Sequence, residues 1–339
     1  MVVDIGTGRI VAAAFLALGL SGCAEEVDIP IDAKIQAPRF YPGEHAPTIG
    51  FDIIASTPEL QAQVCSGALQ VWVEVFNPAT AEWDHVLHTG VSISCSSEPA
   101  NVSLVADNSG SQEEVLELTQ ESVMQFVDDI IDGGGKMGLT RVSTGSEVLT
   151  PLTHEYDVLT DAVDNLFVND GWTALYDGIR MANGSLQQYV ADSIDEDDLC
   201  MDGGRRSIVV FTNGRENNSA DEMNANYSDG IDTTYEDVLN LTVGDVTTPM
   251  YIVGLGDNTD PVFLQELADE TNGHYLAVDA ADDLPEAFGL VSGYATEGAR
   301  ICAELTEVCG PTQVRMSYTL DGWATYVGPK YFAVDVPCA

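Results

Sequence analysis

The stretch that decides the fold is Val102-Ser103-Leu104-Val105-Ala106-Asp107-Asn108-Ser109-Gly110-Ser111. Its first half, Val102–Ala106, has the apolar pattern of a short buried strand, and its second half is a run of small polar residues. Residues 112–132 follow with apolar side chains near helical spacing, and Ser111 and Glu114 form a capping box at their start. A buried strand that passes through a polar turn into a helix is typical of parallel α/β sheets.

The same alternation of strands and helices continues to residue 295. Further buried strands are predicted at Met137–Val142, Ser207–Phe211, Met250–Val253 and His274–Val278. Further helices are predicted at 155–166, 174–190 and 282–292, with one more that Asp260-Pro261 opens and Gly273 closes. Strands that alternate with helices build a mostly parallel sheet with both faces covered. We therefore expect residues 101–295 to form a doubly wound α/β domain.

The flanking segments, 36–100 and 296–339, follow a period of two instead. Every second residue from Leu69 to Val75 and from Val314 to Leu320 is apolar, which is the signature of strands with one buried face. The α/β domain is therefore predicted to be inserted between two β-strand-rich segments. These form either one β-sandwich or two small β modules, and the sequence does not decide between the two arrangements.

The N-terminus has the pattern of an exported protein. An apolar run from Ile10 to Leu20 is too short to cross a bilayer, and Leu20-Ser21-Gly22-Cys23 follows it. This resembles a bacterial lipoprotein signal, which implies a signal peptide over 1–22, a lipid group on Cys23 and a polar tether over 23–35. An ordinary signal cut near Ala24, or a buried helix, is the alternative. We expect a lipid-anchored protein of the bacterial cell envelope, at the outer membrane, facing the periplasm or the surface.

Cysteine usage agrees with export. Of seven cysteines, Cys23 is set aside for lipidation, and an even number remains, which indicates disulfides in an exported chain. We predict Cys65–Cys95, because both residues lie in one strand-rich segment. The pairing of the others does not follow from the sequence.

The charge of the chain excludes some partners. There are 55 acidic and 12 basic side chains, which gives a net charge of −43. A nucleic acid would be repelled, so we expect no nucleic-acid partner. An anionic membrane surface would also be repelled unless a covalent anchor such as the one at Cys23 holds the protein there. Cations, in contrast, should be attracted.

The polar turn after Val102–Ala106 has the residue types of a metal site. Asp107, Ser109 and Ser111 form a D-x-S-x-S pattern at the carboxyl end of a parallel strand, where such sheets bind ligands. One carboxylate and two hydroxyls are hard oxygen ligands that suit Mg²⁺ or Mn²⁺, with Ca²⁺ as a further option. The alternative is structural: Ser111 caps the helix and Asp107 forms the turn.

Two further segments complete a resemblance. Gly171–Ile179 (GWTALYDGI) places a threonine at the start of a helix, and Val209–Asn217 (VVFTNGREN) places polar residues at the end of a strand. With Tyr251–Asp257 (YIVGLGD), their order and spacing make residues 101–295 similar to a von Willebrand factor A (VWA) domain. This family carries a metal-ion-dependent adhesion site (MIDAS), and the resemblance implies that Asp107, Ser109, Ser111 and Thr173 belong to it. An acidic side chain of a protein partner would then complete the metal coordination.

One position departs from the family pattern. The family has Thr-Asp-Gly where this chain has Thr212-Asn213-Gly214, so the site has one negative charge less. Asn213 still offers a carbonyl oxygen, so it stays in the predicted ligand set. Two functions remain open: a binding protein that grips a partner through a metal, or an envelope scaffold with a degenerate metal site. We expect no enzyme, because no nucleophile and base form a recognisable pair.

Overall fold

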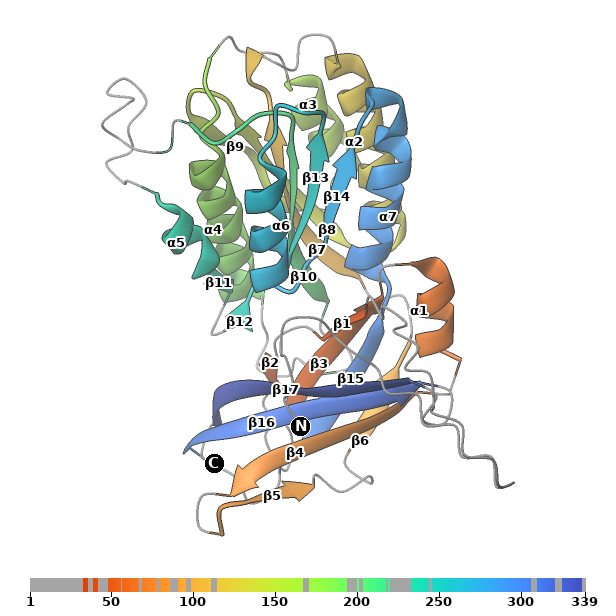
Figure 1. Ribbon diagram of the computed structural model, residues 1–339. Helices are drawn as coiled ribbons and strands as arrows, with labels where there is room; N and C mark the ends of the chain where they lie inside the picture. Colours follow the sequence, from red (N-terminus) through yellow and green to blue (C-terminus); the bar gives the residue numbers. More distant parts are fainter. Residues whose placement is uncertain are drawn as a thin grey trace, which may run out of the picture. The chain divides into compact units, whose positions relative to one another are not determined.

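The computed structural model divides the chain into two units, each described here by itself (Figure 1). The α/β unit comprises Ser97–Asp198 and Asp202–Glu297, and the β unit comprises Met1–Ser96, Leu199–Met201 and Gly298–Ala339. The structure describes residues 33–35, 39–41, 48–55, 57–66, 69–77, 80–85, 91–95, 99–110, 115–166, 171–193, 200, 204–217, 219, 233–243, 246–305, 310–320 and 325–336. Cys23, Ser111, Glu114, Cys309 and Cys338 lie outside these ranges.

A six-stranded sheet forms the centre of the α/β unit, in the order β14-β13-β10-β7-β8-β9. All neighbouring pairs are parallel except β8 and β9. The strands are β7 (Ala100–Asp107), β8 (Lys136–Val142), β9 (Ser146–Thr153), β10 (Arg205–Thr212), β13 (Met250–Leu255) and β14 (Tyr275–Val278). A short antiparallel pair, β11 (Thr242–Val243) and β12 (Val246–Thr247), is separate from this sheet.

Helices cover both faces of the sheet (Figure 1). On one face lie α4 (Leu175–Ser193), α5 (Tyr235–Leu239) and α6 (Pro261–Glu270), which share a buried core with β7, β10 and β13. On the other lie α2 (Leu116–Asp132), α3 (Tyr156–Asp164) and α7 (Leu284–Thr296), the last preceded by the 3₁₀ turn η4 (Ala281–Asp283). Phe288 of α7 packs between Phe126 of α2 and Phe211 of β10. The predicted doubly wound, mostly parallel α/β fold is confirmed.

Two antiparallel sheets make up the β unit. One contains β1 (Ala33–Ile35), β2 (Arg39–Tyr41), β3 (Thr48–Ala55), β6 (Val91–Ser94) and β15 (Ala299–Glu304). The other contains β4 (Gln70–Asn77), β5 (Glu82–His85), β16 (Gly310–Leu320) and β17 (Thr325–Val336). Helix α1 (Pro58–Val64) follows β3. Apolar residues of β3 and β15 form one buried core with those of β4 and β16, so the two β-rich segments form one sandwich.

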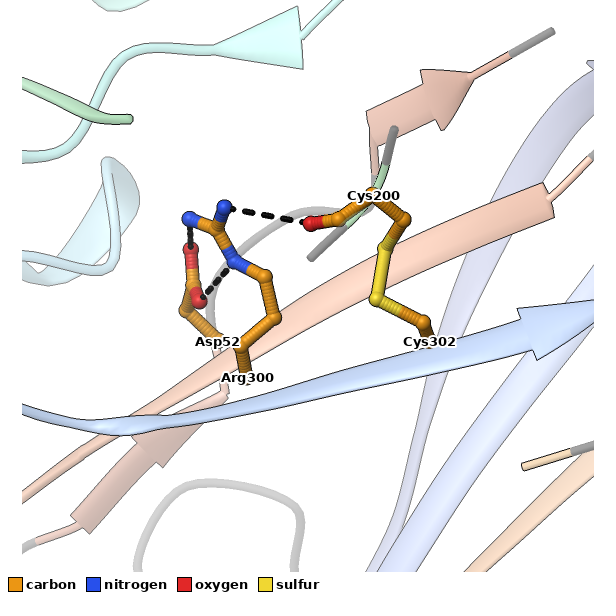
Figure 2. The surroundings of a disulfide bond; sticks show 4 residues. All are labelled: Asp52, Cys200, Arg300 and Cys302. Atoms are coloured by element: carbon orange, nitrogen blue, oxygen red, sulfur yellow. Dashed lines mark hydrogen bonds and ion pairs between the residues drawn. A yellow bond between two sulfur atoms is a disulfide. The ribbon is translucent and has the colours of Figure 1, made fainter. Parts of the chain in front are cut away.

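Among its described residues, the β unit contains two disulfides. Cys65–Cys95 is the predicted pair, and the structure confirms it. The second, Cys200–Cys302, joins residues 102 positions apart and was not predicted (Figure 2). Beside it, the buried Arg300 makes a two-point ion pair with Asp52, at 2.9 Å and 3.0 Å, and donates to the Cys200 carbonyl. The pair satisfies two charges that would be costly to bury singly.

Some details differ from the sequence predictions. Strand β9 was not predicted, although it forms an edge of the sheet. Helix α6 ends at Glu270, and the left-handed residue after it is Asn272, with φ of 59°, rather than Gly273. Gly273 is required for a different reason, because a side chain there would collide with the Met250 backbone. Among the described residues, no helix is long and apolar enough to span a bilayer.

Candidate metal centre

The candidate site is built around Asp107, the last residue of β7. Strand β7 is buried along its whole length between β8 and β10, so it delivers this carboxylate into the protein with only 1% of its surface exposed. Four donors surround the carboxylate. The Ser109 N–H donates to Oδ1 at 2.9 Å, the Thr212 hydroxyl donates to Oδ2 at 2.7 Å, and the Ser109 hydroxyl and the Asn213 N–H also donate.

Burial dominates the ionisation of this carboxyl. Loss of solvent raises the pKa of Asp107 above its ordinary value, and the hydrogen bonds from Thr212, Ser109 and Asn213 lower it only in part. The net shift is upward, because the cost of burying the charged form exceeds the gain from these hydrogen bonds. A bound divalent cation would favour the ionised carboxylate.

Three oxygen atoms of the site converge beside Gly214. A Cβ atom at this glycine would lie 3.0 Å from Thr173 Oγ1, 3.3 Å from Asp107 Oδ2 and 3.7 Å from Ser109 Oγ. Residues from the ends of β7 and β10 and from the turn before α4 therefore meet at one point. Any side chain at Gly214 would therefore press against these oxygens.

The structure thus brings together three of the five predicted ligands: Asp107, Ser109 and Thr173. Asn213 lies between Thr212 and Gly214 in the chain. It is buried, and its backbone N–H donates to Asp107. Ser111 lies outside the described residues. Within the described part of the chain, no group of three or more His, Cys, Asp or Glu side chains could hold a metal. Of the five predicted ligands, three would offer hydroxyl oxygens: Ser109, Ser111 and Thr173.

Further residues hold the site in place, and the sequence analysis did not assign them. Thr212 bonds both Asp107 and the Gly214 backbone. Asn217 accepts a hydrogen bond from the Thr173 N–H at 2.7 Å. Glu216 accepts one from the Tyr176 N–H at 2.9 Å, and burial, followed by the charge of Glu216, raises the pKa of Tyr176 to about 12. The only signal for Glu216 and Asn217 was their position directly after Thr212-Asn213-Gly214.

The family model for the von Willebrand factor type A domain matches residues 101–289. The chain belongs to the VWA family. This membership indicates a role in protein–protein interaction or adhesion. It agrees with the resemblance carried by the segments around Asp107, Thr173 and Asn213.

Solved structures with a similar fold share little sequence with this VWA protein. A von Willebrand factor type A protein from Catenulispora acidiphila is 12% identical (TM-score 0.46; 98% of this chain and 75% of that chain covered). Proximal thread matrix protein 1 from the mussel byssus is 16% identical (TM-score 0.43; 60% and 49% covered). The manganese-loaded TRAP protein of Plasmodium vivax is 12% identical (TM-score 0.40; 72% and 96% covered). A search of curated protein sequences gives no match.

Proposed function

We propose that this protein is a cell-envelope lipoprotein that binds a protein partner through its VWA domain, with a divalent metal bridging to an acidic side chain of that partner. The observation that carries the proposal is the convergence of the Thr173, Asp107 and Ser109 oxygens beside Gly214. Hydroxyl and carboxylate oxygens are the ligands that Mg²⁺ and Mn²⁺ prefer, and Ca²⁺ is a further option.

The proposed ligand set is Asp107, Ser109, Ser111, Thr173 and Asn213. In that set only Asp107 is charged, so a bound divalent ion keeps a net positive charge. The metal would act as a local positive point on a chain of net charge −43, which otherwise repels an acidic partner. The role assigned to the site is binding rather than catalysis.

The second candidate function is an envelope scaffold whose metal site is degenerate, and Asn213 is the observation that favours it. An amide in place of a carboxylate lowers the attraction for a cation. The buried carboxylate of Asp107 and the convergence of three side-chain oxygens beside Gly214 support the binding function instead, because a scaffold has no need for either.

The test is thermal melting of the full chain with EDTA, Mg²⁺, Mn²⁺ or Ca²⁺. At a hundredfold excess over Kd, a bound metal should stabilise the protein by about 2.7 kcal/mol. Ser109→Ala should abolish this gain, because it removes a proposed ligand. Ser103→Ala is the matched control: it removes a hydroxyl buried within the same strand, β7, and should leave the metal response intact. A wild-type protein that no metal stabilises would favour the scaffold.

The proposed anchor is tested separately. Intact mass spectrometry of membrane-extracted protein should show a chain that begins at Cys23 and carries acyl groups, and Cys23→Ala should release the protein from the outer membrane. Two acyl chains are sufficient for stable anchoring. An unacylated chain that begins near Ala24 would refute the anchor without affecting the metal site.

A further inference from the structure

Helix α4 lacks a local cap at its start. The residue before Leu175 is Ala174, whose side chain cannot accept a hydrogen bond, while the first backbone N–H groups of a helix need acceptors. Two of these N–H groups are bonded by residues some forty positions later. Tyr176 donates to Glu216 Oε2 at 2.9 Å, and Asp177 donates to Ser219 Oγ at 3.2 Å.

The loop that supplies this cap is itself closed by hydrogen bonds. Ser219 donates to both oxygens of Glu216, from its backbone at 2.8 Å and from its hydroxyl at 2.7 Å. The Glu216 carboxylate therefore has a fixed orientation at the positive end of the α4 dipole. Side chains of this distant loop therefore cap α4, as a threonine near a helix start often does. The Thr173 hydroxyl remains available for the metal site.

Asn217, in the same loop, holds the backbone of Thr173 from both sides of the residue. The Thr173 N–H donates to Asn217 Oδ1 at 2.7 Å, and the Asn217 N–H donates to the Thr173 carbonyl at 3.0 Å. On the preceding residue, the Trp172 N–H donates to Thr144 Oγ1 at 3.2 Å. The backbone that carries the Thr173 hydroxyl is thus fixed at neighbouring positions.

We infer that Asn217 is a positioning residue of the metal site, which fixes the Thr173 hydroxyl for the metal by its side-chain bond to the Thr173 backbone. The inference rests on the proposed metal function. It gives four residues a shared role in the site: Thr212 orients Asp107, Asn217 orients Thr173, and Glu216 and Ser219 fix the start of α4. Partners that orient metal ligands in this way typically contribute 10–100-fold to metal affinity.

The experiment is Mn²⁺ titration of the full chain by calorimetry, at about 0.15 M salt to screen the acidic surface. Asn217→Ala removes the acceptor for the Thr173 N–H and should weaken Mn²⁺ binding by roughly 10–100-fold. Asn217→Asp keeps an oxygen at that place and should bind Mn²⁺ at least as tightly as the wild type, because its added negative charge also attracts the cation. The matched control is Asn183→Ala, also an asparagine that accepts a hydrogen bond, from Thr248 at 3.1 Å, but in the body of α4.

Hydrogen exchange of the metal-free protein gives a second readout. Asn217→Ala should speed exchange of the Thr173 amide, and Asn183→Ala should not. If the wild type binds Mn²⁺ and Asn217→Ala binds it with the same affinity, the role of Asn217 is overturned while the proposed metal function stands. The same conclusion follows if Asn183→Ala weakens Mn²⁺ binding as much as Asn217→Ala does. No Mn²⁺ binding by the wild type would overturn the proposed function and this inference with it.

Discussion

Gly214 gives the most direct test of the metal site. In Gly214→Ala, the added methyl group would lie 3.0 Å from Thr173 Oγ1 and 3.3 Å from Asp107 Oδ2. These contacts are closer than ordinary van der Waals distance, so the two oxygens must move by a few tenths of an ångström. The backbone at Gly214 is not left-handed, and alanine can adopt it without strain. The substitution therefore acts on the oxygens and leaves the chain path unchanged.

The expected effect on metal binding is large for so small a change. Mg²⁺ demands near-ideal octahedral geometry at about 2.0–2.1 Å, so shifts of a few tenths of an ångström are significant. A tenfold loss of affinity would remove about 1.4 kcal/mol of metal-induced stabilisation at a fixed metal concentration. For a domain of this size, the metal should then raise the Tm of the variant by about 3–6 °C less than it raises the Tm of the wild type.

Differential scanning calorimetry of the full chain, with EDTA or with Mg²⁺, measures this increase. The matched control is Gly289→Ala in α7, where an added Cβ meets no atom within 4 Å. It should keep the full metal response and gain about 0.5–1 kcal/mol from helix propensity. If Gly214→Ala keeps a wild-type metal response, the metal does not bind among these three oxygens, and the reasoning is refuted.

Three other predictions concern the Asp107 carboxyl and two buried links of the β unit. Because the pKa of Asp107 is raised, protonation of this carboxyl stabilises the metal-free protein, and this contribution is lost as pH rises through that pKa. Metal binding, in contrast, requires the ionised carboxylate. Melts from about pH 4 to pH 8 should therefore show a metal-induced gain that shrinks as pH falls. Arg300→Met leaves the Asp52 carboxylate buried without its partner and should cost about 3–5 kcal/mol in urea unfolding. Cys302→Ser should cost about 2–5 kcal/mol by the same measurement, because it opens the link to Cys200.

The parts of the fold that the sequence predicted are those with a strong burial pattern. Strands β7, β10 and β13 are buried on both faces and appear in the sequence as apolar runs. Strand β9 has mixed exposure, contains Pro151 and forms an edge, so no apolar run or strict alternation marks it.

The candidate site divides in a similar way. The meeting of Asp107 with Thr212-Asn213-Gly214 could be predicted, because polar residues at the carboxyl ends of neighbouring parallel strands lie at one edge of the sheet. Thr173 lies before α4 and follows no parallel strand, so its assignment to the site depended on the resemblance to the VWA family. The bonds between Asn217 and Thr173 and between Glu216 and Tyr176 could not be predicted, because they join residues forty or more positions apart through loop conformation alone. The Cys200–Cys302 bond could not be predicted either, because it joins residues 102 positions apart.

The hydrogen bonds from Thr212 and Asn217 also bear on what Asn213 implies for metal binding. If the ligands were held only by the metal, the loss of one negative charge would remove both affinity and arrangement. Here protein hydrogen bonds hold both residues: Thr212 holds Asp107, and Asn217 holds Thr173. The arrangement therefore persists while the charge is reduced, and an acidic partner can supply the missing negative charge. Metal and partner should then bind cooperatively. Acetate, as a small analogue of an acidic side chain, should raise Mn²⁺ affinity by the same factor as Mn²⁺ raises acetate affinity. Mn²⁺ affinity that acetate leaves unchanged would show that the metal, if bound, offers no position to a carboxylate.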